Sequence, residues 1–387
     1  MTDGRLSDRV SLAVDTRWLM MAIFFLQPVA FGAWLPRIPD IQQRLGLGPA
    51  DLALALLGLP VGTLLTLIFA GRFVARIGSR ATILYGFVVF LAVVGLPAFS
   101  QSFWFLFLSL AATGVALSVL ELGLNVAADE VEKSSGKLIM NTCHGFWSLG
   151  IMTGSLVGAG LAGAGFEPQW SVIGTAGAVL PLALVAAVSM PDLRSSLQPP
   201  AESGRWSVPG KALLAICFFV FGITMTEGAA ADWSAVYLRD VFAIGPGAAG
   251  LGYAIFAGMV ALGRLAGDRL KARLGPRKLA RFCGLFALAG IALVAAAPWP
   301  TAAFAGFALV GFGVSVGFPL AVTAAAELTD RPTAASVAIL SFVALSGFLI
   351  GPPLIGLVAE ALDLRYGLAA LLPVLIVSLV MTRALTR

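Results

Sequence analysis

Four ionisable side chains lie inside long apolar runs of this sequence, and they are Glu121, His144, Glu227 and Asp232. In a membrane-spanning run, an ionisable residue costs about 2.5–3.5 kcal/mol on insertion scales, so its presence indicates a function by default. Carboxyl groups bind and release protons, and carboxyl and imidazole groups both form hydrogen bonds with hydroxyl groups. These residue types predict a buried polar site that takes a proton and a hydroxyl-bearing ligand.

Glu121 belongs to a stripe of polar residues at helical spacing. Ser118 lies three residues before it and Asn125 four residues after it, so the three share one helix face. The stripe suits hydroxyl ligands and one proton. We expect Glu121 to be the proton-coupling group and Asn125 to contact the solute. The alternative is a Glu that only bonds a neighbouring helix.

His144 has a polar and an aromatic neighbour at helical spacing. Asn141 lies three residues before it and Trp147 three residues after it. The pattern favours a solute-binding face on which His144 and Asn141 form hydrogen bonds and Trp147 stacks on a sugar ring. The alternative is a buried His with satisfied hydrogen bonds and an ordinary aromatic neighbour.

Glu227 shares a helix face with Thr224 and Ser234, and we expect it to bind the solute. Asp232 follows five residues later, on another face, and is a weaker candidate for the same role. Two other roles remain open for Asp232: an ion pair with Arg239, or the capping of a helix break near the Gly-Ala run.

A third candidate face contains Gln27, Phe31 and Trp34, which recur at i, i+4 and i+7. An aromatic stripe of this kind is typical of core packing. Gln27 favours a solute-binding role for Gln27 and Trp34, and both interpretations remain open.

The composition places these residues in a membrane protein. Hydrophobic residues make up 59% of the chain and charged residues 12%, with a mean hydropathy of +0.95. Soluble domains carry about a quarter charged residues, so lipid must cover part of this surface. The excess of positive charge sits in short loops without a basic face, which argues against nucleic acid. A single His excludes a multi-His metal site, and the three separated Cys are typical of small buried hydrophobic residues. We expect no metal, no cofactor and no enzymatic activity.

Apolar runs of about 20 residues, the length that a membrane helix needs, predict an all-α membrane protein with twelve transmembrane helices. The runs lie, in order, at residues 18–36, 50–70, 81–99, 103–127, 138–162, 169–190, 211–236, 248–266, 279–297, 301–325, 335–359 and 366–383.

The distribution of Lys and Arg predicts the orientation. With the N-terminus inside, only Arg37, Arg44, Arg239 and Arg365 of the 25 Lys and Arg face outward, and the remaining 21 are cytoplasmic. We therefore expect a multi-pass protein of the bacterial inner membrane, a monomer in the lipid bilayer, with both termini in the cytoplasm.

The two halves of the chain repeat each other at an offset of 197 residues. We expect two pseudo-symmetric six-helix bundles, residues 1–190 and 211–387, joined by a cytoplasmic linker at 191–210 that is rich in Pro and Ser. Parallel repeats of this kind place the solute site between the halves. Matched positions include Gly48-Pro49 with Gly245-Pro246, the Arg-x-Gly-x-Arg segments at 76–80 and 273–277, Ser118 with Ser315, and Glu130 with Glu327.

Opposite charges from both halves lie at the same membrane face and suggest an ionic gate on the cytoplasmic side. Ordinary juxtamembrane charge is the alternative, because positive-inside topology already requires the arginines. The gate candidates are Arg76, Arg80, Glu130, Arg273, Arg277 and Glu327.

Several segments resemble known carriers. Residues 71–80, Gly-Arg-Phe-Val-Ala-Arg-Ile-Gly-Ser-Arg, resemble the loop 2–3 signature of the major facilitator superfamily (the MFS fold), and residues 267–278 are a similar second copy. Residues 141–150 and 232–240 resemble the YbjJ-like carriers, distant relatives of the fucose permease and of the MosC-type carriers linked to rhizopine, an inositol-like solute. The resemblance covers all twelve spans and implies proton-coupled or facilitated movement of a sugar-like solute.

The sequence also departs from that signature. Its usual Asp is Ala75 in the first loop and Ala272 in the second, so a gate ion pair must be rebuilt, with Asp268 as a candidate. The fourth span lacks the Arg, and the fifth lacks the Gly-Pro pair, that are typical of drug/proton antiporters. We therefore expect a secondary transporter that moves a sugar, polyol or inositol-like solute by alternating access in symport with protons. The alternative is a proton-driven exporter of amphipathic compounds.

Overall fold

The computed structural model describes residues 16–66, 69–191, 209–329 and 332–385. Within these ranges, twelve helices are long and apolar enough to cross a membrane, which confirms the twelve predicted spans. Several helices run well past the apolar core that the sequence predicts, because polar turns extend them at the ends. Phe103–Ser135, for example, continues eight residues beyond position 127.

The first six spans form one bundle. Thr16–Leu45 contains α2 (Val29–Trp34), a 3-10 turn at Leu35–Arg37 and α3 (Ile38–Leu45). The following elements are α4 (Pro49–Leu56), α5 (Gly58–Thr66), α6 (Ala70–Ile77), α7 (Ser79–Val93), a 3-10 turn at Leu96–Phe99, α8 (Phe103–Ser135), α9 (Met140–Gly163) and α10 (Pro168–Ser189).

The last six spans form the second bundle. They are α11 (Lys211–Phe242), α12 (Pro246–Leu274), α13 (Pro276–Ala296), α14 (Pro300–Val314) with α15 (Gly317–Ala326), α16 (Thr333–Ala361), and α17 (Leu364–Ala369) with α18 (Leu371–Met381) and a 3-10 turn at Thr382–Ala384.

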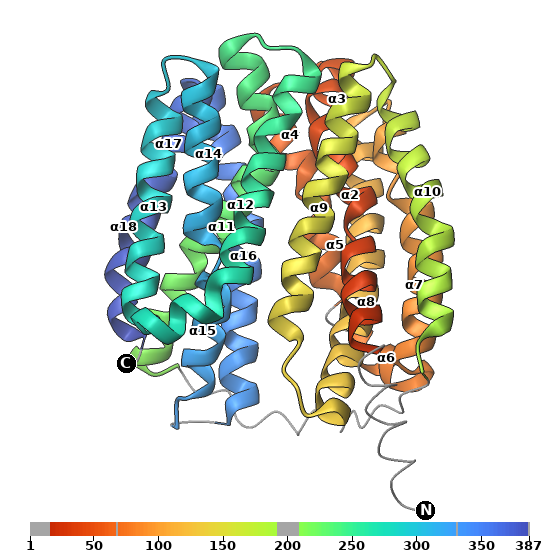
Figure 1. Cartoon of the computed structure of the whole chain (residues 1–387). Coiled ribbons are helices and arrows are strands. Elements are labelled where there is room, and N and C mark those ends of the chain that lie inside the picture. The colour runs from red at the N-terminus through yellow and green to blue at the C-terminus, as the bar shows by residue number, and fades with distance from the viewer. Residues whose placement is uncertain (1–15, 67–68, 192–208, 330–331, 386–387) are drawn as a thin grey trace, which may run out of the picture.

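The two bundles stand side by side, with α9 and α12 facing each other between them (Figure 1). The first and the last span have their chain ends at the same end of the molecule, the lower end in Figure 1, which we call the termini end; the opposite end is the far end. The expected linker at 191–210 falls almost entirely outside the described residues.

The backbone repeats at the offset that the sequence predicts. Gly46 ends α3 and Ala243 ends α11, both in the left-handed conformation, with φ of 62° and 53°. Gly78 and Gly275 precede α7 and α13 with φ of 84° and 76° and the same ψ of 159°. Each pair is separated by 197 residues, so equivalent loops of the two halves turn in the same way.

Several of the described spans are interrupted by a turn, and two of these turns contain a polar residue. The first is interrupted by a turn at Gln27 and Pro28, and the tenth by a turn at Ser315 and Val316 between α14 and α15. Proline has no backbone N–H, so Pro28 and Pro319 each leave a carbonyl one turn earlier without its helical donor. Irregular backbone at membrane depth is tolerated where protein buries it or a cavity contains it. These breaks therefore point to the region where a solute can bind.

Candidate functional site

An ion pair forms the centre of the site. Arg264 of α12 places Nη2 3.0 Å from Oε1 of Glu227 on α11, and the two side chains are only 15% and 19% exposed. Both residues belong to the second bundle. The pair neutralises two charges that would each be expensive inside a membrane.

The same arginine also reaches the first bundle. Arg264 Nη1 donates to Ser148 Oγ on α9 at 2.8 Å, and Ser148 Oγ in turn donates to the carbonyl of His144 at 3.0 Å. Arg264 therefore connects the two halves of the molecule inside the spans. A movement of one half against the other must stretch or break this link.

Glu121 and His144 lie within the electrostatic reach of Arg264, whose charge acts on both side chains. Glu121 belongs to α8 of the first bundle, so each half contributes an acid within the electrostatic reach of this arginine. The amide Nδ2 of Asn125 donates a hydrogen bond to the Glu121 carbonyl at 3.0 Å. We expect this side-chain amide to contact the solute, and the bond uses its nitrogen rather than its oxygen.

Gln27 and Trp147 form a second polar contact between spans. The indole N–H of Trp147 donates to Gln27 Oε1 at 2.6 Å, and the edge of Phe24 packs on the His144 ring at 5.5 Å between centroids. Gln27 is fully buried, and its Nε2 has no hydrogen-bond partner among the described residues. This side of the site therefore retains one free amide donor.

Trp34 and Asp232 are also expected to bind the solute, and their surroundings differ from those of the residues above. Trp34 is 2% exposed within the hydrophobic core. Asp232 lies five residues beyond Glu227 on α11, and its charge acts on the Tyr253 phenol as those of Glu227 and Arg264 do. Asp232 takes neither of the two alternative roles, the ion pair with Arg239 or the capping of a helix break. The helix α11 is continuous, so there is no break to cap, and Arg239 bonds Asp240, Pro39 and Gln42 instead.

A cavity of about 260 Å³ leads from Arg264 and His144 toward the termini end. It is bounded by α9, α12, α15 and the start of α13. Across it, Asn141 Nδ2 donates to Asp268 Oδ1 at 3.0 Å, so the rebuilt contact at Asp268 joins the halves through an amide. Its polar lining consists of Asn141, His144, Arg264, Asp268, Lys271, Ser315 and Thr323.

Two of the expected gate residues, Glu130 and Arg80, form hydrogen bonds within the first half. Glu130 Oε2 accepts a hydrogen bond from Ser79 Oγ at 2.9 Å, and Arg80 Nη2 donates to the Val188 carbonyl at 2.7 Å. The side chains of Arg76 and Arg273 are exposed, while Arg277 is half-buried and Glu327 is exposed at the end of α15. The ionic gate between the halves stays a prediction for the other state of the transport cycle.

Arg264 is the functional residue that the sequence reasoning missed. It lies inside the predicted span 248–266 and belongs with the ionisable residues at membrane depth. The cytoplasmic count of 21 Lys and Arg is therefore too high by one, and the asymmetry on which the orientation rests is unaffected. The signal was available: an Arg within an apolar run is as costly as a Glu.

Comparison with known proteins gives consistent matches over the whole chain. The family model described as Major Facilitator Superfamily matches residues 18–293 and 212–387. An uncharacterized MFS-type transporter of Yersinia pestis is 33% identical over 380 residues, which covers 98% of this chain and 97% of that protein. Membrane protein MosC of Rhizobium meliloti is 29% identical over 356 residues, which covers 91% of this chain and 85% of that protein.

Solved structures show the same fold. A variant of the nucleoside transporter NupG superposes with a TM-score of 0.77 at 13% identity, covering 96% of this chain and 100% of that one. A variant of the E. coli fucose:proton symporter FucP superposes with a TM-score of 0.67 at 17% identity, covering 97% and 99%. At these identities the likeness concerns the fold alone.

Proposed function

This chain belongs to the major facilitator superfamily of transporters, and on that premise we propose that it carries a sugar, polyol or inositol-like solute across the membrane in symport with protons. The observation that carries the proposal is the Arg264–Glu227 ion pair: its arginine lines the cavity, bonds Ser148 of the other half and lies within electrostatic reach of Glu121. Alternating access moves the halves about a site in this position.

Glu121 is the proposed proton site, because it lies on the opposite half from the Arg264–Glu227 pair. When Glu121 is ionised, it attracts Arg264 across the interface. When it is protonated, that attraction is lost and Glu227 retains the arginine. A ligand shifts a conformational equilibrium only through its different affinity for the two states, and this exchange supplies such a difference for the proton.

The proposed solute contacts come from both halves, and Glu227 of α11 is the proposed contact of the second half. His144, Asn141 and Trp147 of α9 offer hydrogen bonds and an aromatic face, and Gln27 offers its free amide N–H. These groups suit a hydroxylated ring. The resemblance to carriers of sugar-like and inositol-like solutes points the same way, and the fold is shared by a fucose:proton symporter and a nucleoside transporter. Export of amphipathic compounds would call for a broader apolar cavity.

The test separates coupling from binding. Purified protein is first screened for binding with sugars, inositols and amino sugars, and the best binder is used in proteoliposomes. Glu121→Gln has the shape of the protonated acid and cannot titrate, so it should keep counterflow and lose accumulation driven by a pH gradient. Glu227→Gln should weaken binding, since it removes a charge-assisted hydrogen bond worth roughly 1.5–3 kcal/mol. Uphill uptake by Glu121→Gln would refute the proton site.

We further propose that the protein lies in the bacterial inner membrane as a monomer with both termini in the cytoplasm, in two bundles at 1–190 and 211–387. The concentration of Lys and Arg in the loops of the termini end supports this orientation. A periplasm-active reporter fused to the C-terminus should be inactive, and the same reporter placed after Phe166 at the far end should be active. The reverse pattern contradicts the orientation.

A further inference from the structure

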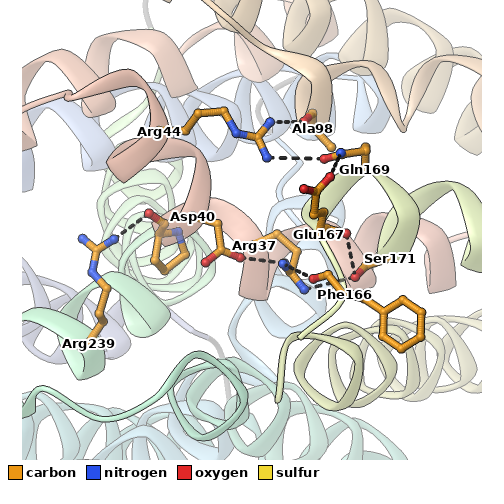
Figure 2. A network of polar contacts seen from close by, with 10 residues as sticks. Arg37, Asp40, Arg44, Ala98, Phe166, Glu167, Gln169, Ser171 and Arg239 are labelled. Carbon is orange, nitrogen blue, oxygen red and sulfur yellow. Dashed lines mark hydrogen bonds and ion pairs between the residues drawn. The ribbon is translucent and has the colours of Figure 1, made fainter. Parts of the chain in front are cut away.

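Four arginines of the far end donate hydrogen bonds to backbone carbonyls, and three of them appear in Figure 2. Three act within their own half, and Arg239 alone reaches from one half to the other. The bonds run from Arg37 to Phe166 at 2.8 Å, from Arg44 to Ala98 at 2.8 Å, from Arg365 to Ala297 at 2.6 Å and from Arg239 to Pro39 at 2.5 Å.

Arg239 also bonds its own counterpart in the other repeat. Its Nη2 donates to Gln42 Oε1 at 2.6 Å, and the two residues are 197 positions apart, the offset of the repeat. Equivalent residues of two repeats meet each other only near the axis that relates the repeats. The contact therefore marks the pseudo-two-fold axis at the far end, where the halves must part if this end opens.

From this geometry we propose that Arg239 is the latch that keeps the far end closed, and that it thereby sets which side of the membrane the cavity faces. Its two hydrogen bonds cross from α11 to α3, and both acceptors move away together when the halves separate. Among the described residues, the other hydrogen bond across this end, from Ala50 N to Glu360 Oε2, is longer at 3.3 Å and exposed.

The chemistry of the latch suits repeated opening. Both acceptors, a carbonyl and an amide, are neutral, so release leaves no unpaired acid on the first half. On its own helix Arg239 keeps Asp240, whose Oδ1 lies 2.5 Å from Nε, and the side chains of this pair are 24% and 37% exposed. The guanidinium thus retains a counter-charge and access to water after release, and the open state is not penalised by a buried charge.

The test measures both ends of the molecule by spin-label distances. The three native cysteines are replaced by alanine, and labels are placed at Phe166 and Tyr366 for the far end and at Leu138 and Leu274 for the termini end, all exposed positions. A hydrogen bond to a charged group corresponds to about tenfold or more in a two-state ratio. Arg239→Gln should therefore increase the far-end-open population by about tenfold or more, with a matching closure of the termini end.

Two variants provide matched controls. Arg44→Gln removes an arginine–carbonyl bond from the same end but within one half, so it should leave both distance distributions as in the wild type. The double variant Gln42→Arg with Arg239→Gln exchanges the residues across the axis. Because Val236 is the repeat counterpart of Pro39, the transplanted arginine faces an equivalent carbonyl, and the distributions should return toward those of the wild type.

The outcomes are decisive in either direction. The latch is refuted if Arg239→Gln leaves the distances unchanged, if Arg44→Gln shifts them equally, or if the exchange variant behaves like Arg239→Gln alone. Should Arg239→Gln fail to reach the membrane, Gln42→Ala carries the test. It removes the bond between repeat counterparts and, within the first half, the bond from Gln42 Nε2 to the Leu47 carbonyl. It should then shift the same populations in the same direction by a smaller factor, and no shift would overturn the proposal.

Discussion

Arg264 and Glu227, 37 residues apart in the chain, form an ion pair inside the membrane spans with 3.0 Å between Nη2 and Oε1. The pair joins α11 to α12, and its arginine continues to Ser148 of the other half. In the proposed mechanism, stability, solute binding and coupling therefore depend on the same few atoms. Their contributions can be separated only by comparing single and double substitutions.

Removing one partner of this pair should cost more than removing both. Arg264→Gln or Glu227→Gln leaves an uncompensated charge in a largely buried position, and we expect each to destabilise the protein by about 2–3 kcal/mol, below the value for a fully buried pair because some exposure remains. The double variant should lose much less than the sum. Thermal unfolding of purified protein in detergent gives the coupling energy, and additive losses would contradict the pairing.

The cytoplasmic gate makes a second prediction. If Glu130 and Glu327 meet arginines of the opposite half when the termini end closes, Glu130→Gln with Glu327→Gln should destabilise that closed state. Labelling of a cysteine at Thr323, which lines the cavity, should then rise. Ser79→Ala is the control, because it removes only the bond to Glu130 within one half. Equal labelling in the double variant and the wild type would reduce both acids to ordinary loop charges.

The left-handed helix end at Ala243 makes a third prediction. A residue with a Cβ is strained at φ of 53°, whereas its counterpart Gly46 holds φ of 62° without that cost. Ala243→Gly should stabilise the protein by about 0.5–1 kcal/mol, and Gly46→Ala should destabilise it by a similar amount. Thermal unfolding in detergent measures both. Destabilisation by Ala243→Gly would show that the entropy of glycine in the unfolded chain outweighs the strain.

The fold could be read from the sequence because its determinants are local. A run of about 20 apolar residues suffices to predict a span, and Gly48-Pro49 and Gly245-Pro246 do begin α4 and α12. The constant offset of 197 residues then predicted that the second half has the same six-helix arrangement as the first. Helix ends were less predictable, because polar turns beyond the apolar run are held by capping and packing rather than by lipid.

The site could be predicted only in part, because its contacts depend on how helices pack. The acids and His144 were recognised by their cost in an apolar run, and the same argument applies to Arg264. Its pairing with Glu227 requires the approach of α11 and α12, which no spacing reveals. The alternative pair of Asp232 and Arg239 shows the limit of spacing arguments. Seven residues along a continuous helix are about 10 Å apart, too far for an ion pair.

The last prediction concerns the small residues that seal the far end. Gly250 packs on Ala159 across the interface, and Gly356 packs on Ala53 in the equivalent contact. Gly250 is the repeat counterpart of Ala53, and Gly356 is the counterpart of Ala159, so each contact pairs one glycine with one alanine. A Cβ at Gly250 would lie 2.7 Å from Pro36 Cβ and 2.8 Å from Ala159 Cβ. Carbon atoms pack at about 3.5–4.0 Å, so a larger side chain cannot fit while this end is closed.

Gly250→Val, and likewise Gly356→Val, should therefore wedge the far end open and close the cavity toward the termini end. Labelling of a cysteine at Thr323 should fall in each variant, and fall further when both are combined, because the two contacts lie on either side of the pseudo-two-fold axis. Gly174→Val is the matched control: it places the same β-branched residue inside a helix, α10, at a position with no atom within 4 Å of a new Cβ. Unchanged labelling in Gly250→Val, or an equal fall in Gly174→Val, would show that close packing at this seam does not govern the opening of the far end.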